Sequence, residues 1–251
     1  MNSAFEEVYR ARFDEAGPDG RLRTSTYLRW AQDLAWRHSE KAGLARDWYG
    51  ERRLTWLIRA VELDLATELR FGDTVRVTTE VIGFRRVWAR RRTMFADAGS
   101  GRLSATALTD WVLLGESGLP ARVPEEISQR FAVGAATFSP LRVDLPDTPR
   151  KASWREFAIR LSEVDPLGHV NNAAYIDYVE EHLAATGLGE LAQRLPRRVR
   201  GEFRLAAEPG ADLVGRGWPE DAGYSYRLSD EGGRELFRAQ LVVEPGELVG
   251  G

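Results

Sequence analysis

The residues best suited to chemistry lie close together in the stretch 162–181, SEVDPLGHVNNAAYIDYVEE. Asp165, His169, Asn171 and Asn172 fall within eight residues, around a turn marked by a proline and a glycine. A carboxylate can serve as a general base or nucleophile, and an imidazole can move a proton or polarise a bond. We interpret this turn as the active centre, with Asp165 and His169 as its catalytic pair. Turn and helix-cap chemistry alone would also explain the Asp and Asn residues here.

A helical pattern begins directly after this turn. Asn171 or Asn172 is expected to cap the helix, because a side-chain amide oxygen can accept a free N–H of the first turn. Apolar residues then recur at helical spacing as far as Leu183. The N–H groups of Val170, Asn171 and Asn172 would lie at the positive end of the helix dipole, which favours an anion or a developing oxyanion.

The elements around this stretch follow an α+β order rather than an alternation of strands and helices. The first half predicts a short strand at Val8–Phe13, a long helix at Thr24–Ala42, and four strands at Leu54–Leu65, Asp73–Phe84, Val87–Ala96 and Leu103–Leu114. Residues 115–152 form a Pro-rich connector without a sustained period, with a short helix near Glu125–Phe131. Later strands are expected at Trp154–Leu161, Arg198–Ala206, Leu213–Trp218, Tyr224–Leu228 and Leu236–Val243.

The second half of the chain repeats the first. A shift of 148 residues aligns 12–33 with 160–181 without a gap, with identical pairs at Arg12/Arg160, Glu15/Glu163, Pro18/Pro166, Gly20/Gly168 and Tyr27/Tyr175. The first copy has Gly17 opposite Asp165 and Arg21 opposite His169, so it lacks the acid–imidazole pair. Each long helix has an apolar stripe that needs a sheet to cover it. We therefore expect two such units, of which only the second is functional.

Composition excludes several classes of function. The 251 residues include no cysteine, so disulfides, thiolate metal sites and a Cys nucleophile are excluded. The net charge is −3, and the sequence contains no long apolar run. We therefore expect neither a nucleic-acid partner nor a membrane partner. The sequence has no HExxH, GxGxxG, P-loop or GxSxG pattern, so no metal or cofactor is expected. Because the start carries no signal pattern, we expect a cytoplasmic protein.

The motif DPLGHVNNAAY at Asp165–Tyr175, followed by YVEE, resembles the signature of hotdog-fold thioesterases. In that fold a long helix is wrapped by an antiparallel sheet. Two tandem copies with the motif in the second resemble the plant and bacterial acyl-ACP thioesterases. GPDGRLR, LAWRHSEKAG and TWLIRAVELDL in the first copy support this resemblance, which runs from about Val8 to Val243.

The resemblance implies a tandem double hotdog that hydrolyses fatty-acyl thioesters on the phosphopantetheine arm of acyl carrier protein. Asp165 would activate water or attack directly, and His169 would orient or polarise. N–H groups around Val170–Asn172 would bind the thioester oxygen. The chain departs from the family pattern at Leu167, where an Asn is usual, and at Ala206 and Ala207, where a Glu and a Cys are usual.

These expectations define the domains. We expect an N-terminal hotdog with a degenerate site at 1–114, the connector at 115–152, a C-terminal hotdog with the catalytic motif at 153–245, and a tail at 246–251. Because the tandem copy already supplies the pairing that single hotdog chains obtain by dimerising, a monomer or a homodimer is expected.

Some charged residues have two interpretations. Arg194, Arg197, Arg198 and Arg200 are either solvated or dock the acidic carrier protein. Glu180 and Glu181 are helix surface charges, with a supporting role in the site as the minority interpretation. A buried core position is expected for His38, and a solvated one for His182.

Two alternative functions stay open. One is an acyl-CoA thioesterase, which differs in the carrier of the acyl group. The other is a non-catalytic double hotdog that binds an acyl group or another ligand, which Leu167, Ala206 and Ala207 make plausible. The length of the acyl chain cannot be predicted from the sequence.

Overall fold

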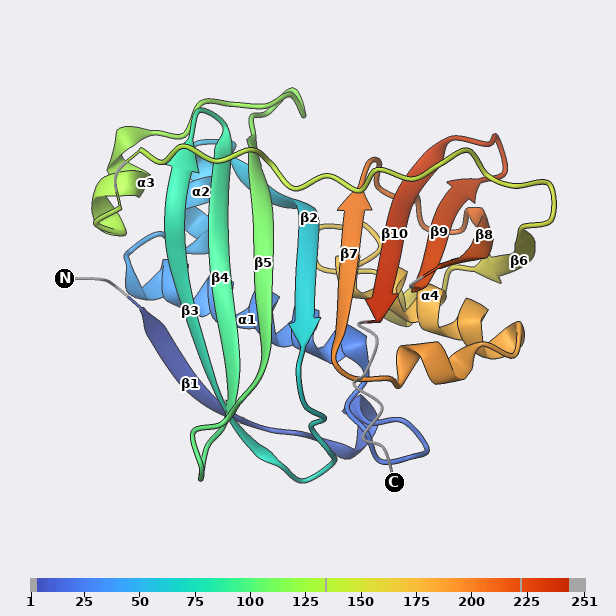
Figure 1. Ribbon diagram of the computed structural model, residues 1–251. Coiled ribbons are helices and arrows are strands. Elements are labelled where there is room, and N and C mark those ends of the chain that lie inside the picture. Colours follow the sequence, from blue (N-terminus) through green and yellow to red (C-terminus); the bar gives the residue numbers. More distant parts are fainter. Residues whose placement is uncertain (1–3, 134, 222, 244–251) are drawn as a thin grey trace. The chain divides into compact units, whose positions relative to one another are not determined.

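The chain forms two compact units, each with one long helix against an antiparallel sheet (Figure 1). The computed structural model describes residues 4–133, 135–221 and 223–243. The first unit comprises Met1–Val61 and Glu68–Leu141, and the second comprises Glu62–Thr67 and Arg142–Gly251. The boundary at Leu141 falls inside the predicted connector, so its first part belongs to the first unit. The predicted tail at 246–251 lies outside the described residues.

The first unit is built on five strands. They are β1 (Phe5–Arg10), β2 (Thr55–Leu65), β3 (Thr74–Arg85), β4 (Trp88–Asp97) and β5 (Leu103–Leu114). Their order is β1-β3-β4-β5-β2, and the pairs β1/β3, β3/β4 and β4/β5 are antiparallel. All five were predicted, but β1 begins and ends three residues earlier than expected. It stops there because Phe13–Glu15 forms a 3-10 turn, η1, in which Glu15 accepts the Arg12 N–H at 2.9 Å.

The long helix α1 (Thr24–Lys41) matches its prediction and packs against β1, β3 and β5. Its buried stripe includes Tyr27, Leu28 and Leu34, which are at most 1% exposed. His38 lies on the same stripe and is buried, as expected, with its ring stacked on Phe5 at 5.6 Å.

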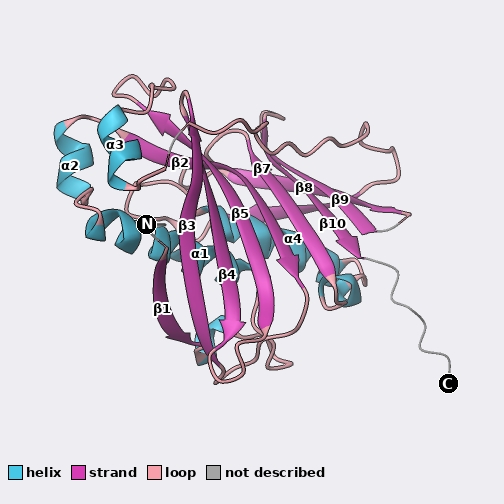
Figure 2. Cartoon of the chain, turned by 60° about the vertical axis from the view of Figure 1, so that its left-hand side comes forward, coloured by secondary structure: helices cyan, strands magenta, loops and turns pink. Residues whose placement is uncertain are grey.

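Two short helices lie side by side near the C-terminal end of α1 (Figure 2). They are α2 (Arg46–Glu51), which the sequence pattern missed, and α3 (Glu125–Arg130), which was predicted. Arg130 on α3 connects them to α1 by donating to the carbonyl oxygen of Ala42 at 3.1 Å.

The second unit repeats this architecture. Its strands are β6 (Ser153–Ala158), β7 (Arg197–Phe203), β8 (Asp212–Glu220), β9 (Gly223–Asp230) and β10 (Glu235–Val243). They lie in the order β7-β10-β9-β8-β6, with antiparallel neighbours. The helices are η2 (Leu161–Glu163), α4 (Asn172–Ala185) and η3 (Gly189–Ala192). Tyr175 of α4 packs on Phe203 of β7 and on Phe237 of β10, with ring centroids 5.5 and 5.4 Å apart. The α+β tandem double hotdog is therefore confirmed.

Candidate active site

The turn predicted as the active centre is a closed hairpin that precedes α4. The Asp165 N–H donates to the His169 carbonyl oxygen at 2.8 Å, and the Gly168 N–H donates to the Asp165 carbonyl oxygen at 2.9 Å. Gly168 has φ of +81°, a left-handed conformation that glycine adopts without steric cost. The turn therefore holds the two predicted catalytic residues at its two ends.

The two side chains differ in exposure. Asp165 is half-buried, and its Oδ1 accepts the Leu167 N–H at 2.9 Å. His169 is exposed. This local bond occupies one lone pair of the carboxylate, so Asp165 keeps acceptor positions for a water molecule.

Asn171 is the helix cap, as one of the two predicted alternatives. Its Oδ1 accepts the Ala173 N–H at 2.9 Å. The Asn171 N–H, however, donates to the Glu163 carbonyl oxygen at 2.8 Å. The prediction that this N–H binds the thioester oxygen is therefore wrong, because the backbone of η2 already accepts it. Val170 is buried, and Asn172 is the first residue of α4.

Tyr175 joins α4 to the segment after β7 and was not among the predicted site residues. It is 2% exposed, and its hydroxyl accepts the Ala207 N–H at 2.9 Å. Burial is the main cause that raises the pKa of Tyr175 to about 12; the bond from the Ala207 N–H opposes this rise, and the charge of Asp165 adds to it. Tyr175 therefore stays protonated at neutral pH. Tyr175 is identical to Tyr27 across the repeat, which could have drawn attention to this position. A residue present in both copies, however, indicates packing rather than chemistry.

Ala206 and Ala207 do not lie in a strand, which corrects their expected position. The β7 ladder ends at Phe203, after which the N–H groups of Arg204 and Leu205 donate to the Leu236 carbonyl oxygen at 2.7 and 3.2 Å. The segment after β7 nevertheless reaches the site, since Ala207 is bonded to Tyr175. Ala207 is thus held against α4 rather than in the β7 ladder.

A carboxylate beneath the turn ties it to α4. Glu163 Oε2 accepts the Arg160 N–H at 2.8 Å and the Tyr178 hydroxyl at 2.7 Å. Because Tyr178 lies on α4, this bond fixes the start of the turn to the helix that follows it.

The first copy reproduces the backbone bonds of the turn and the carboxylate contact to the long helix, without the catalytic pair. The Gly17 N–H donates to the Arg21 carbonyl oxygen at 2.8 Å, and Trp30 Nε1 donates to Glu15 Oε1 at 2.9 Å. Gly20 has φ of +79°. The internal repeat is therefore confirmed at atomic detail, and the acid and imidazole are what distinguish the second turn.

The predicted supporting residues lie further along α4. Glu180 and Glu181 are both half-buried, and Glu181 lies 3.9 Å from Arg160. Their supporting role stays a prediction.

The arginines proposed for docking are largely engaged within the second unit. Arg198 forms a bidentate pair with Asp64, and Arg200 donates to Glu62 at 2.6 Å. Arg197 is buried, and its docking role stays a prediction. Arg194 is exposed.

The prediction that His182 is solvated is wrong. Its side chain is fully buried on α4, with Nε2 2.9 Å from Ser153 Oγ, and burial lowers its pKa. His182 follows Val179 by three residues and Tyr175 by seven, which is the spacing of the apolar stripe.

Within the described residues, no group of three or more His, Asp or Glu side chains is arranged to hold a metal ion. None of the helices in the described part of the chain is long and apolar enough to cross a membrane.

Comparison with known proteins identifies relatives of both halves. A family model described as the acyl-ACP thioesterase N-terminal domain matches residues 2–131, and one described as the C-terminal domain matches residues 147–213. A chloroplastic acyl-[acyl-carrier-protein] hydrolase of Cuphea viscosissima is 26% identical over 96% of this chain and 63% of its own length. A chloroplastic palmitoyl-acyl carrier protein thioesterase of Cuphea hookeriana is 25% identical over 96% of this chain and 62% of its own length. The chain thus spans less than two thirds of these relatives.

Solved structures share the fold. A putative oleoyl thioesterase from Lactobacillus plantarum aligns with a TM-score of 0.85 and 18% identity, covering 96% of this chain and 97% of that chain. A 12:0-ACP thioesterase from Umbellularia californica aligns with a TM-score of 0.80 and 19% identity, covering 96% and 97%.

Proposed function

This chain belongs to the acyl-ACP thioesterase family, and from that premise we propose that it hydrolyses fatty-acyl thioesters of acyl carrier protein to a free fatty acid and the carrier thiol. One observation carries the proposal. Two copies of the same turn are present, and only the second holds a carboxylate and an imidazole, at Asp165 and His169. Duplicated packing explains the shared contacts but not this difference.

The proposed reaction uses Asp165 as the general base. Asp165 takes a proton from a water molecule while the water oxygen attacks the thioester carbonyl carbon. The C–S bond of the tetrahedral intermediate then breaks, and the proton held by Asp165 passes to the leaving thiolate. His169 orients the thioester or polarises its carbonyl. Direct attack by Asp165 is the second route: the carboxylate would displace the thiolate to form a mixed anhydride, and water would then hydrolyse the anhydride to the fatty acid and free Asp165.

The oxyanion would be stabilised by the start of α4. The helix end carries partial positive charge that favours a developing negative oxygen. Since the Asn171 N–H is engaged with the Glu163 carbonyl oxygen, we retain the Val170 N–H as the donor to the oxyanion. Protonated Tyr175 would hold the segment at Ala207 against the site.

The predicted docking arginines differ in exposure and in their ion pairs. Among the predicted docking arginines, Arg194 is exposed, whereas Arg198 and Arg200 are neutralised by Asp64 and Glu62. We propose that Arg194 contributes to binding the acidic carrier and that Arg198 and Arg200 do not. Charge reversal at Arg194 should raise KM for acyl-ACP and spare acyl-CoA.

A thiol-release assay tests the function. Purified protein is incubated with acyl-ACP and acyl-CoA series of several chain lengths, and free thiol is titrated. Faster release from acyl-ACP supports the proposal, and faster release from acyl-CoA would favour the acyl-CoA thioesterase. Acyl binding without release in either series would instead identify a binding protein. A cytoplasmic location and a monomeric or dimeric state stay predictions.

A further inference from the structure

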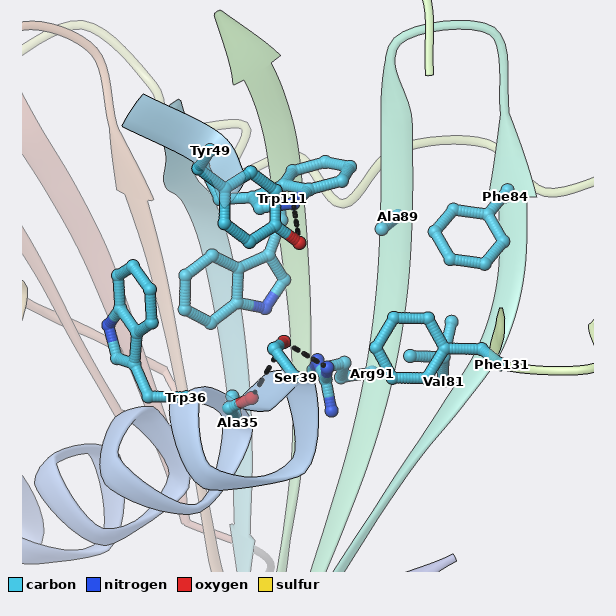
Figure 3. A pocket seen from close by; sticks show the side chains of 11 residues that line it. Ala35, Trp36, Ser39, Tyr49, Val81, Phe84, Ala89, Arg91, Trp111 and Phe131 are labelled. Carbon is cyan, nitrogen blue, oxygen red and sulfur yellow. Dashed lines mark hydrogen bonds between the residues drawn. The ribbon is translucent and has the colours of Figure 1, made fainter. Parts of the chain in front are cut away.

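A pocket in the first unit lies between α1 and the sheet and does not involve the catalytic turn (Figure 3). It holds about 440 Å³ of empty space, including its open mouth. Most of its wall is apolar or aromatic, from residues that include Trp36, Trp56, Val81, Phe84, Trp111 and Phe131. Concave, largely apolar pockets with few polar groups are the usual form of a small-molecule site.

Arg91 is the charged group in this wall. It lies on the inward-facing row of β4, where the side chains of Ala89, Thr93 and Phe95 are also buried, and it is 6% exposed. Its Nη1 donates to His38 Nδ1 at 3.1 Å, and its Nη2 donates to Ser39 Oγ at 3.3 Å. Arginine has only donors, so both partners are neutral acceptors.

The neighbouring arginines of β4 each have a carboxylate counter-ion. Arg90 forms a bidentate pair with Asp110 at 2.6 and 2.8 Å, and Arg92 pairs with Glu80. No carboxylate in the described part of the chain forms an ion pair with Arg91. The most buried of the three cations is therefore the one without a counter-ion.

A buried cation without a counter-ion is costly, and it indicates a function when it lies in a pocket. Burial lowers the pKa of Arg91 to about 10, so the guanidinium is still charged at neutral pH. Ser39 donates its own proton to the Ala35 carbonyl oxygen at 3.0 Å and cannot neutralise that charge. An anion brought into the pocket would supply the missing partner.

The surroundings of Arg91 specify the rest of such a ligand. Phe131 faces the guanidinium with its centroid 5.2 Å away, and aromatic and aliphatic side chains form the remaining wall. Tyr49 also lines the pocket, and its hydroxyl accepts from Trp56 Nε1 at 3.1 Å and keeps a proton to donate. The charged end would therefore meet Arg91 and Tyr49, and the body would meet apolar surface.

We propose that this pocket binds an organic carboxylate with an apolar body, whose carboxylate pairs with Arg91. The site goes beyond the proposed hydrolysis, because it lies in the unit without the catalytic pair. Two sources share this chemistry: a free fatty acid, and an acyl chain that carries a carboxylate at its far end.

Calorimetric titration tests the proposal in the Asp165→Asn variant, so that turnover plays no part. The probes are octanoate and octan-1-ol, which share the same chain and differ in charge. Octanoate should bind at least about ten-fold more tightly, because a charge-assisted bond to the guanidinium is available only to the acid. Equal affinities, or binding of neither probe, would overturn the proposal.

Variants test whether Arg91 itself, rather than the overall charge of the protein, causes the preference for octanoate. Arg91→Met should abolish the preference for octanoate, and Arg91→Lys should retain part of it. Arg92→Met is the matched control, because Arg92 lies next in sequence on the opposite face of β4, and the preference should survive there. A preference that persists in Arg91→Met contradicts the assignment.

A second variant applies if Arg91→Met does not fold. Ala89→Leu fills the pocket with Arg91 intact and should weaken octanoate binding at least about ten-fold. Unchanged binding would place the ligand elsewhere.

Kinetics with the wild-type protein distinguish the two sources. A lower KM for a thioester with a terminal carboxylate than for the octanoyl thioester, lost in Arg91→Met, identifies the end of the acyl chain. Equal KM values combined with octanoate binding identify the free acid. Because binding is measured without turnover, failure of the proposed hydrolysis would not be confused with failure of this site.

Discussion

The Tyr178 hydroxyl donates to Glu163 Oε2 at 2.7 Å and joins α4 to the start of the catalytic turn. The same contact joins Trp30 to Glu15 in the first unit, 148 residues earlier. A contact preserved in the unit without a catalytic pair belongs to the scaffold. Loss of this contact should therefore slow hydrolysis only when the contact is removed in the second unit.

Replacing Tyr178 by Phe should slow hydrolysis about ten-fold and lower the free energy of unfolding by about 1–3 kcal/mol, because Glu163 loses a charge-assisted bond and the turn loosens. Urea denaturation and thiol release measure the two effects. Trp30→Phe is the matched control, and it should reduce stability without changing kcat. Slower hydrolysis in Trp30→Phe as well would show that the loss is one of general stability.

Much of this scaffold could be predicted from the sequence. The gapless repeat placed both long helices, since α1 and α4 begin at positions that correspond exactly to the shift. The helix α2 could not be predicted from the sequence, because six residues are too few to show a helical period. Such a short helix depends on packing, here on that of Tyr49 against Trp36.

The polar contacts of the site were harder to predict. Asn171 could be chosen as a cap from its type, but the acceptor of its own N–H lies on η2 and depends on the tertiary fold. The ion pairs of Arg198 and Arg200 join residues more than 130 positions apart, and a single sequence gives no signal for such pairs.

Removing the cap of α4 should destabilise the second unit. Asn171→Ala should cost about 1 kcal/mol, because the Ala173 N–H loses its acceptor, whereas Asn171→Asp should cost less. Thermal unfolding monitored by circular dichroism measures the difference. Arg23→Ala is the control at the corresponding position of α1, where no side-chain cap bond exists. Equal losses at both positions would contradict the role of Asn171 as the cap.

Buried His182 should make the protein acid-sensitive. Burial, assisted by the charge of Arg155, lowers the pKa of His182 below its usual 6.5, so the unfolded chain binds a proton more readily than the folded one. The resulting stability is present above about pH 6.5 and is lost as pH falls below that value. Urea midpoints measured across this range should fall less steeply in His182→Gln. Parallel slopes in the two proteins would contradict this assignment.

Tyr175 should act at the alkaline end. The pKa of Tyr175 is about 12 in the folded protein and about 10 in the unfolded chain, so the unfolded chain ionises first. The contribution of Tyr175 to the free energy of unfolding is therefore complete below pH 10 and is lost as the pH rises toward 12. Tyr175→Phe should weaken this dependence. It should also cost about 1–3 kcal/mol at neutral pH, because the buried Ala207 N–H loses its acceptor. Tyrosinate absorbance and denaturant titration measure both; a Tyr175 that ionises near pH 10 in the folded protein would contradict its burial.

The central claim is that the carboxylate of Asp165 activates the water that cleaves the thioester. Asp165→Asn keeps an oxygen that can accept the Leu167 N–H but removes the base. Asp19→Asn makes the same change in the turn of the first unit, where Asp19 Oδ1 accepts the Arg21 N–H at 3.0 Å. The measurement is kcat for thiol release from acyl-ACP in these two variants. We expect a loss of at least about a hundred-fold in Asp165→Asn and none in Asp19→Asn; undiminished release from folded Asp165→Asn would contradict the role of Asp165 as the base.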